Sequence, residues 1–256
     1  MRPSGPILQS NLNRSARAQD LFGQALAERE VGLGVVAEPY RVPVHPSWIG
    51  DSLGSVAIVW TGRPASPPCS LIESGRGFVA ADWGGTVVVG VYAPPSWPLA
   101  SFEVLLDEVR RCVLRCLPCP VIVLGDFNSK ATAWGSPRTD PRGETLLDWA
   151  AGLELRLLNT GSVHTCVRQH GGSIVDLSFA TPAAARRISG WRVVAEVETL
   201  SDHRYITMVL SATPPDATPR GRPQEGITPP PRWSLKKLNK DALMAAAHVV
   251  AWHSAY

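Results

Sequence analysis

The run Val121–Asn128, with the sequence VIVLGDFN, constrains the fold of this chain more than any other segment. Its four apolar residues, three of them β-branched, indicate a short strand that is buried on both faces of a sheet. Side chains two residues apart on a strand point to the same side, so we expect Asp126 and Asn128 to face one site. A carboxylate at the end of a buried strand is costly unless it has a partner, a metal or a chemical task. The run therefore predicts a site for metal-assisted chemistry.

Other segments of the chain show the periodicities of strands and helices. Apolar residues at helical spacing predict helices over residues 15–29, 101–117 and 143–151. The tripeptide Trp83-Gly84-Gly85 indicates a hairpin turn between two strands. Strands are expected over residues 7–10, 32–37, 55–60, 77–82, 86–91, 154–158, 174–180, 191–197 and 205–210. Because several strands follow one another without a helix between them, we expect a layered α/β sandwich with mixed sheets.

The composition of the chain changes after Leu210. The chain has 256 residues, of which 45% are hydrophobic, which is enough for one large domain with a sizeable core. Beyond Leu210, Pro, Arg and Gly become frequent and the periodicity is lost, as in an extended linker. We therefore expect a domain over residues 1–211, a Pro-rich linker over 212–231 and, over 232–256, the truncated start of a following region.

Charge and cysteine content limit the partners and the compartment. The formal net charge of +3 is compatible with a polyanionic partner but too small to establish one. The N-terminal segment lacks the apolar core of a signal peptide, and no stretch approaches the roughly 18 apolar residues of a membrane span, so we expect no membrane partner. The five cysteines are an odd number, which favours free thiols in a reducing, intracellular compartment.

Three of the cysteines have the spacing of an iron–sulfur site. Cys112, Cys116 and Cys119 form the pattern CxxxCxxC. The first two lie at i and i+4 of a predicted helix, whereas a cluster needs thiolates that converge from a loop. No fourth cysteine or pair of histidines follows at the spacing of a zinc site. We therefore interpret these residues as packed or free thiols.

Polar residues occupy the ends of several predicted strands. Mg²⁺ prefers carboxylate oxygens and keeps several waters, which leaves room for phosphate oxygens. A histidine whose ring is fixed by a carboxylate can move protons or stabilise charge near neutral pH. Each residue alone has a plainer interpretation, since Asp and Asn favour turns. Together these strand-end residues predict phosphodiester hydrolysis. The residues are Asn11, Glu38, Tyr92, Asp126, Asn128, Asp176, Asp202 and His203.

Six motifs in chain order, QSNLN, AEPY, VYAPP, GDFN, SIVDLSF and SDHR, resemble the exonuclease–endonuclease–phosphatase superfamily, which includes DNase I. The blocks GDFNSKATAWGSPRTDPRG and VHTCVRQHGGSIVDLSFAT are similar to the endonuclease domain of non-LTR (LINE-type) retrotransposons. This resemblance implies a DNase I-like four-layer α/β sandwich, with two mixed β-sheets flanked by helices. It also implies a nuclease that nicks double-stranded DNA with Mg²⁺, or with Mn²⁺ as a substitute, to prime insertion of the element. Fusion to a reverse transcriptase and action in the nucleus follow from the same resemblance.

The resemblance also implies roles for residues at the metal. Glu38 is expected to be the principal metal ligand, with Asn11 beside it. Asp202 is expected to support the metal or the water. Asp126 is expected to orient or deprotonate the attacking water, so Glu38 and not Asp126 is the first choice of metal ligand.

Further residues are expected to contact phosphate. Asn128 and Tyr92 would hold the scissile phosphate, and His203 would donate to it, with its ring oriented by Asp176. Thr165 is expected in the phosphate region. Affinity for the duplex would come largely from basic side chains on phosphates, for which the loop residues Arg138, Arg142 and Arg168 are candidates.

Two other functions remain open from the sequence. A phosphomonoesterase or lipid phosphatase of the same superfamily would share the motifs but have a pocket in place of a groove. A catalytically inactive nucleic-acid-binding module would keep the fold without the chemistry. One departure is informative: repair-type relatives carry Asp where this chain has Asn13, which argues against an abasic-site repair role.

Overall fold

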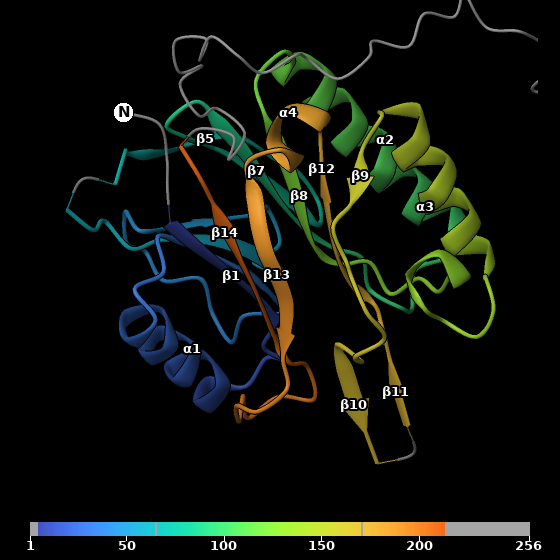
Figure 1. Ribbon diagram of the computed structural model, residues 1–256, viewed down its shortest axis with the longest axis horizontal. Helices are drawn as coiled ribbons and strands as arrows, with labels where there is room; N and C mark the ends of the chain where they lie inside the picture. The colour runs from blue at the N-terminus through green and yellow to red at the C-terminus, as the bar shows by residue number, and fades with distance from the viewer. Residues whose placement is uncertain (1–4, 65, 170, 213–256) are drawn as a thin grey trace, which may run out of the picture. The chain divides into compact units, whose positions relative to one another are not determined.

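The computed structural model describes residues 5–64, 66–169 and 171–212, and in this part of the chain two six-stranded sheets pack face to face (Figure 1). The first sheet has the order β13 (Ile188–Val194), β14 (Tyr205–Leu210), β1 (Gly5–Asn11), β2 (Leu33–Ala37), β4 (Val56–Trp60) and β3 (Trp48–Gly50). The second has the order β5 (Cys69–Ser74), β6 (Phe78–Trp83), β7 (Thr86–Tyr92), β8 (Val121–Asp126), β12 (Asp176–Ala180) and β9 (Arg156–Leu157). A separate hairpin, β10 (Cys166–Arg168) and β11 (Gly171–Ser173), projects from the body.

Each sheet contains one parallel pair of strands, and a helix connects the members of each pair. β1 and β2 are parallel and joined through α1 (Ala16–Glu28), and β7 and β8 are parallel and joined through α2 (Leu99–Cys116). Parallel strands need such a crossover because a tight turn reverses the chain direction. The other pairs in both sheets are antiparallel, so both sheets are mixed.

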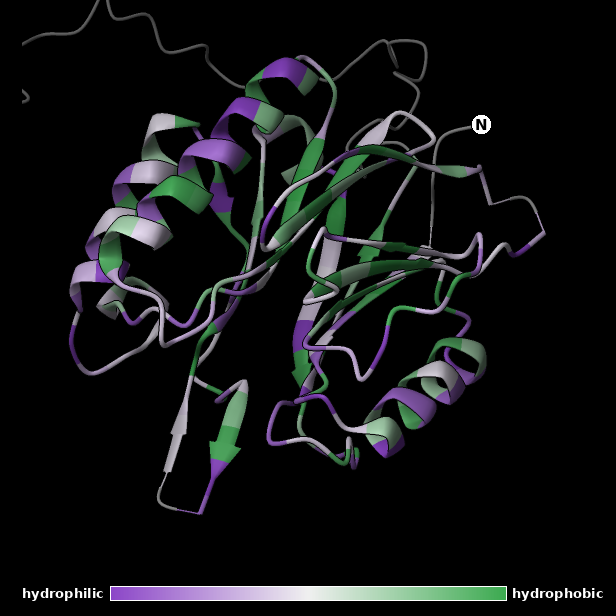
Figure 2. Ribbon diagram, turned by 180° about the vertical axis from the view of Figure 1, so that it is seen from behind, coloured by the Kyte–Doolittle hydropathy of each residue, from purple (hydrophilic) through white to green (hydrophobic). Residues whose placement is uncertain are grey.

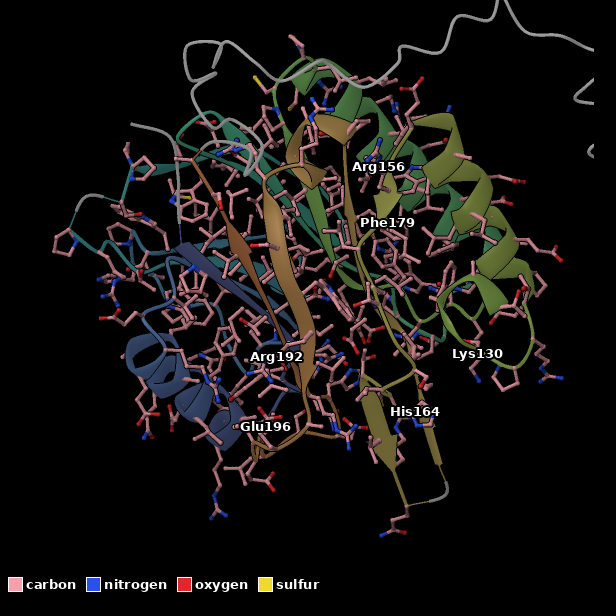
Figure 3. All side chains as sticks on the ribbon, in the orientation of Figure 1. Lys130, Arg156, His164, Phe179, Arg192 and Glu196 are labelled. Atoms are coloured by element: carbon pink, nitrogen blue, oxygen red, sulfur yellow. The ribbon has the colours of Figure 1, made fainter. Side chains whose placement is uncertain are left out.

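Three layers of buried apolar side chains hold the fold together. The first fills the space between the sheets and includes Ile7, Val35, Val88 and Ile122. A second seals α1 against the outer face of the first sheet, and a third seals α2 and α3 (Pro141–Gly152) against the second sheet. Figure 2 shows apolar strands inside and polar outer helix faces, and Phe179, labelled in Figure 3, packs toward the helices from β12. The predicted α/β sandwich with mixed sheets is confirmed, with four layers.

Local sequence signals explain where the helices begin. The Ser15 hydroxyl accepts a hydrogen bond from Ala18 N at the start of α1, and the Asp140 carboxylate does the same for Gly143 N in α3. Both are N-cap residues of the kind that satisfies a free N–H at a helix start. The structure adds β3, β5, the hairpin β10–β11, the short helix α4 (Pro182–Ala185) and a 3₁₀ turn, Thr132–Trp134, which periodicity did not predict.

The predicted linker and the region after it fall almost entirely outside the described residues, since the described chain ends at residue 212. Both remain predictions. Among the helices that the structure describes, none is long and apolar enough to cross a membrane.

Candidate active site

Strand register brings the predicted site residues to one edge of the sandwich. In the second sheet, Asp126 of β8 lies directly opposite Asp176 of β12 and beside Tyr92 of β7. In the first sheet, Asn11 pairs with the last residue of β2, and Glu38 follows that residue. The four strand ends therefore deliver two carboxylates, a phenol and an amide to the same place before any loop is considered.

The Asn11 amide joins the two sheets at this edge. Its Nδ2 donates to Glu38 Oε2 at 3.1 Å and to Asp126 Oδ2 at 3.0 Å. One amide thus holds a carboxylate from each side of the interface between the sheets. Arg14 Nε lies 3.4 Å from Glu38 Oε1, but this arginine is largely exposed, so solvent screens its charge and the pair contributes little. The site retains excess negative charge, which suits a divalent cation.

Two left-handed turns aim the side chains, and one of them corrects the expectation from the strand pleat. β8 ends at Asp126, and Asn128 has a φ of +45°, so its position does not follow from strand alternation. The turn folds Asn128 back, and its N and Nδ2 donate to Asp126 Oδ1 and Oδ2, each at 2.9 Å. Glu38 also has a φ of +45°. Such conformations cost about 1–3 kcal/mol each and persist where the surroundings over-determine them.

Gly125 is required by the close approach of two strands. A Cβ at this position would lie 1.9 Å from Val91 O in β7. Any larger residue would push β7 and β8 apart, and with them Tyr92 and Asp126. The glycine of the GDFN motif therefore sets the spacing of the site.

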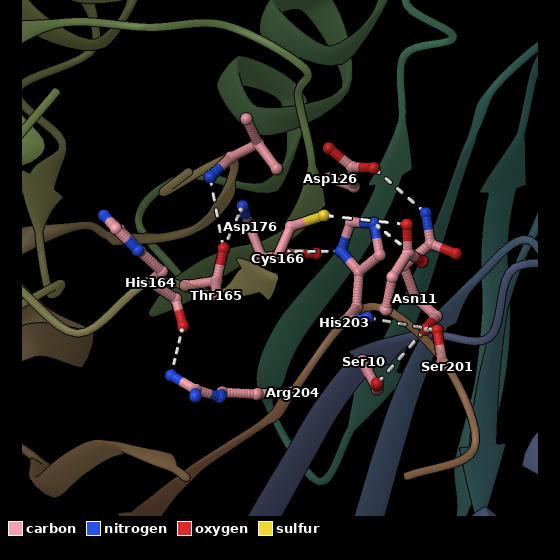
Figure 4. Close-up of polar contacts among 12 residues, drawn as sticks. Ser10, Asn11, Asp126, His164, Thr165, Cys166, Asp176, Ser201, His203 and Arg204 are labelled. Carbon is pink, nitrogen blue, oxygen red and sulfur yellow. Dashed lines mark hydrogen bonds and ion pairs between the residues drawn. The ribbon is translucent and has the colours of Figure 1, made fainter. Parts of the chain in front are cut away.

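His203 lies buried between two carboxylates (Figure 4). Its Nδ1 is 2.8 Å from Asp176 Oδ2, and its Nε2 is 3.8 Å from Asp202 Oδ1. Burial by itself lowers the pKa of His203, but the charge of Asp176 and the hydrogen bond to it outweigh burial and raise the pKa. The Ser201 hydroxyl accepts from His203 N and donates to Asn11 O, which ties this loop to β1.

The environment also shifts the two groups beside His203. Burial first, and then the charge of Asp176, raise the pKa of Asp126 to about 7. Burial and the adjacent Glu38 carboxylate raise the pKa of Tyr92, so its phenol stays protonated and can donate. Pairs of titratable groups with displaced pKa values are typical of sites that transfer protons.

Thr165 is fully buried beside the start of β12. Its hydroxyl oxygen accepts from the backbone N–H groups of Val175 and Asp176, both at 3.1 Å. Thr165 therefore fixes the start of β12 and, through it, the carboxylate that orients His203. Its expected contact with the phosphate region stays a prediction.

Arg142 is likewise directed into the protein. Its guanidinium donates to Pro94 O at 2.9 Å, Phe127 O at 3.0 Å and Ala93 O at 3.2 Å, and it stacks over Phe102 at 4.3 Å. These carbonyls belong to the loops after β7 and β8, which carry the site. Arg142 therefore clamps the two loops, and its contact with DNA stays a prediction.

The other two predicted arginines remain exposed. Arg168 Nε donates to Asp202 Oδ2 at 2.7 Å from the hairpin β10–β11, and Arg138 lies on the exposed segment before α3. A hollow of about 420 Å³ beside the hairpin is lined by Asn128, Lys130, Cys166, Arg168 and His203, among others. The site thus opens to solvent along a surface with basic side chains.

Comparisons with known proteins agree with this geometry. A family described as "Endonuclease-reverse transcriptase" matches residues 86–207. The RNA-directed DNA polymerase from the mobile element jockey of Drosophila melanogaster is 28% identical over 179 residues, which cover 66% of this chain and 18% of that protein. The endonuclease domain of TRAS1, a telomere-specific non-LTR retrotransposon, is 26% identical with a TM-score of 0.70, over 82% of this chain and 99% of that one. The chain is thus similar to the endonuclease domain of a non-LTR retrotransposon over most of its length.

The predicted DNase I-like fold is also confirmed. A 3'-5' exonuclease from Neisseria meningitidis, 18% identical, superposes with a TM-score of 0.60 over 80% of this chain and 99% of that chain. At this identity the match shows the DNase I-like fold alone. The similarity to nucleases, together with the cluster of Asp126, Asp176 and His203, supports a hydrolytic nuclease with a candidate metal site.

Sequence reasoning missed the residues that support the site. Gln9 and Ser201 each open a quoted motif, QSNLN and SDHR, but neither was assigned a role, although Gln9 bonds the backbone of β8 and Ser201 bonds the backbone of Asn11. The position of Gln9, two residues before Asn11 on the same strand, was the available signal, since both side chains point to one face.

Proposed function

We propose that this domain nicks double-stranded DNA by Mg²⁺-dependent phosphodiester hydrolysis. The observation that supports this most is the convergence of two amides, three buried or half-buried carboxylates, a phenol and a histidine at one end of both sheets. Mn²⁺ is expected to substitute for Mg²⁺, because both take hard oxygen ligands.

The donor set fits a hard divalent cation. Glu38 and Asn11 would hold it, each through a side-chain oxygen, and Asp126 lies on the other side of the Asn11 amide. Asp202 is expected to support the metal or the water from beyond His203. When bound, the cation supplies charge neutralisation at the phosphate and acidifies water.

The chain's own groups then divide the proton transfers. Asp126, fixed by Asn11 and Asn128, accepts the proton of the attacking water. His203, held protonated by Asp176, donates to the phosphate as its negative charge grows. Tyr92 donates to the same phosphate through its phenol, and Asn128 through its amide, which in the free protein donates to Asp126 and Ala93. Such preorganised donors stabilise the transition state more than the ground state.

The relatives support a proposal on the substrate and its context. The jockey protein is an RNA-directed DNA polymerase, so we propose that this endonuclease is joined to a reverse transcriptase. The nick would then release a 3′ hydroxyl that primes reverse transcription at the target. Chromosomal DNA as the target places the activity in the nucleus. Arg138 and Arg168 are the proposed phosphate contacts among the predicted arginines.

Incubation of the protein with supercoiled plasmid tests the function directly. With Mg²⁺ we expect conversion to open circles, and with EDTA no conversion. His203→Gln should lower the nicking rate by roughly 10²-fold or more, because one preorganised donor is worth that much. His45→Gln, at an exposed histidine, is the matched control and should nick at the wild-type rate. Nicking that persists in EDTA or in His203→Gln would overturn the proposal.

The pH dependence of nicking should report Asp126. Its carboxylate must be ionised to accept a proton, and burial together with Asp176 raises its pKa to about 7. The rate should therefore fall as the pH drops through this region. A bound cation favours the ionised form, so the inflection should move to lower pH as the Mg²⁺ concentration rises. If the pH of the inflection does not change with Mg²⁺ concentration, the fall in rate at low pH belongs to a group other than Asp126.

A further inference from the structure

Cys166 places a thiol beside the two groups that flank the reaction site. It is the first residue of β10, it is buried, and its backbone forms a bridge with His203. Its Sγ lies 3.8 Å from Asp202 Oδ2. One ligand atom each from Cys166, Asp202 and His203 lie within 4.8 Å of one another. Figure 4 shows the sulfur facing the imidazole.

These three residues form a ligand set that differs in chemistry from the Glu38 side of the site. Thiolate, imidazole and carboxylate together suit Zn²⁺ and similar borderline metals, whereas Mg²⁺ takes oxygen ligands. Three protein ligands with an open fourth position are the usual arrangement of accessible zinc sites. The hollow of about 420 Å³ that is lined by Cys166 and His203 leaves that position open to water.

The surroundings orient each ligand for such an ion. Asp176 binds His203 Nδ1, so Nε2 faces Asp202. A carboxylate on the far nitrogen of a ligating histidine is the common outer partner in zinc sites. Arg168 Nε donates a hydrogen bond to Asp202 Oδ2. Oδ1 of Asp202 is buried, and no hydrogen-bond partner for it lies within the part of the chain that the structure describes.

We propose that Cys166, Asp202 and His203 bind Zn²⁺, and that this ion inhibits the nuclease. On binding, the Cys166 thiol and the Nε2–H of the His203 imidazolium each release one proton to solvent, and Zn–S and Zn–N bonds form with no change of oxidation state. The ion takes His203 Nε2, which is then unavailable to donate to the phosphate. The inhibitory step rests on the proposed role of His203, but binding does not.

Co²⁺ as a spectroscopic stand-in for Zn²⁺ tests the site independently of activity. Titration of the full chain should give a sulfur-to-cobalt charge-transfer absorption with a stoichiometry of one ion, and added Zn²⁺ should displace it. Cys166→Ser should abolish this absorption and raise the apparent Kd by about 10²-fold, since even outer partners of a metal site are worth about 10- to 100-fold. Cys116→Ser is the matched control, because Cys112 and Cys116 interact on α2 and form the alternative thiol pair.

Plasmid nicking is then measured for the same variants in Mg²⁺ at increasing concentrations of Zn²⁺. Wild type and Cys116→Ser should lose nicking, whereas Cys166→Ser should nick with Mg²⁺ alone and resist at least tenfold more Zn²⁺. Cobalt absorption that survives in Cys166→Ser, or disappears in Cys116→Ser, would overturn the site. Cobalt binding at Cys166 without inhibition would keep the site and reject the inhibitory step. A protein that binds cobalt as expected but never nicks plasmid would contradict the proposed function and leave the metal site standing.

Discussion

Asp126→Asn is expected to lower the rate of plasmid nicking by about 10²–10⁴-fold, the range for loss of a general base. The substitution keeps the shape of the side chain but removes its basicity. It also turns an acceptor into a donor opposite the Nδ2 groups of Asn11 and Asn128, both of which bind Asp126 Oδ2. The proton acceptor and the geometry of the amide bridge are therefore lost together.

The measurement is a single-turnover time course on supercoiled plasmid at saturating Mg²⁺. Asp107→Asn, on the exposed face of α2, makes the same chemical change away from the site and should leave the rate unchanged. Matching circular dichroism spectra would show that both variants are folded. If Asp126→Asn nicks within a few-fold of wild type while folded, Asp126 is not the base, and the assignment of the proton acceptor must move to another group.

The sequence predicted the elements whose side chains alternate or repeat with strong contrast. The Val121 run, the hairpin around Gly84 and the two long helices are confirmed, because burial on both faces or on one stripe leaves a clear periodicity. β5 was missed because it is an edge strand with mostly exposed side chains. Three-residue strands such as β3, β10 and β11 are too short to show a period.

Membership of the site was easier to predict than the path of each side chain. Polar residues at strand ends pointed to Asn11, Glu38 and Asp126, and strand register does bring their strand ends to one edge. Side-chain direction in loops has no such rule. Asn128 reaches Asp126 through a left-handed turn, and Arg142 folds inward onto carbonyls because Phe102 and two loops surround it. An arginine at the end of an element has the same local sequence signal whether it contacts DNA or clamps the fold, and Arg142 is the second residue of α3.

Gln9→Met is expected to lower the free energy of unfolding by roughly 3 kcal/mol, because each buried polar group left without a partner costs about 1–3 kcal/mol. Gln9 is buried in β1, and its Nε2 donates to Gly125 O at 3.2 Å and to Leu177 O at 3.3 Å in the opposite sheet. Its Oε1 accepts from the Ser178 hydroxyl at 3.0 Å, and that hydroxyl in turn accepts from Trp191 Nε1. Met has a similar length but removes all three bonds.

The same substitution should also reduce nicking, because the two carbonyls that Gln9 binds are next to site residues. Gly125 precedes Asp126 on β8, Leu177 follows Asp176 on β12, and the two lie opposite each other in the sheet. Gln9 and Asn11 share one face of β1, so this strand contacts the site in two ways. Gln9 binds backbone carbonyls beside the site, and the Asn11 amide binds the site carboxylates. Urea unfolding measures the stability. The concentration of Mg²⁺ that gives half-maximal nicking in the folded variant measures positioning, and it should rise. Gln24→Met, at an exposed glutamine of α1, should change the stability by less than about 0.5 kcal/mol. A folded Gln9→Met with an unchanged Mg²⁺ requirement would show that the inter-sheet bonds stabilise the sandwich without positioning the site.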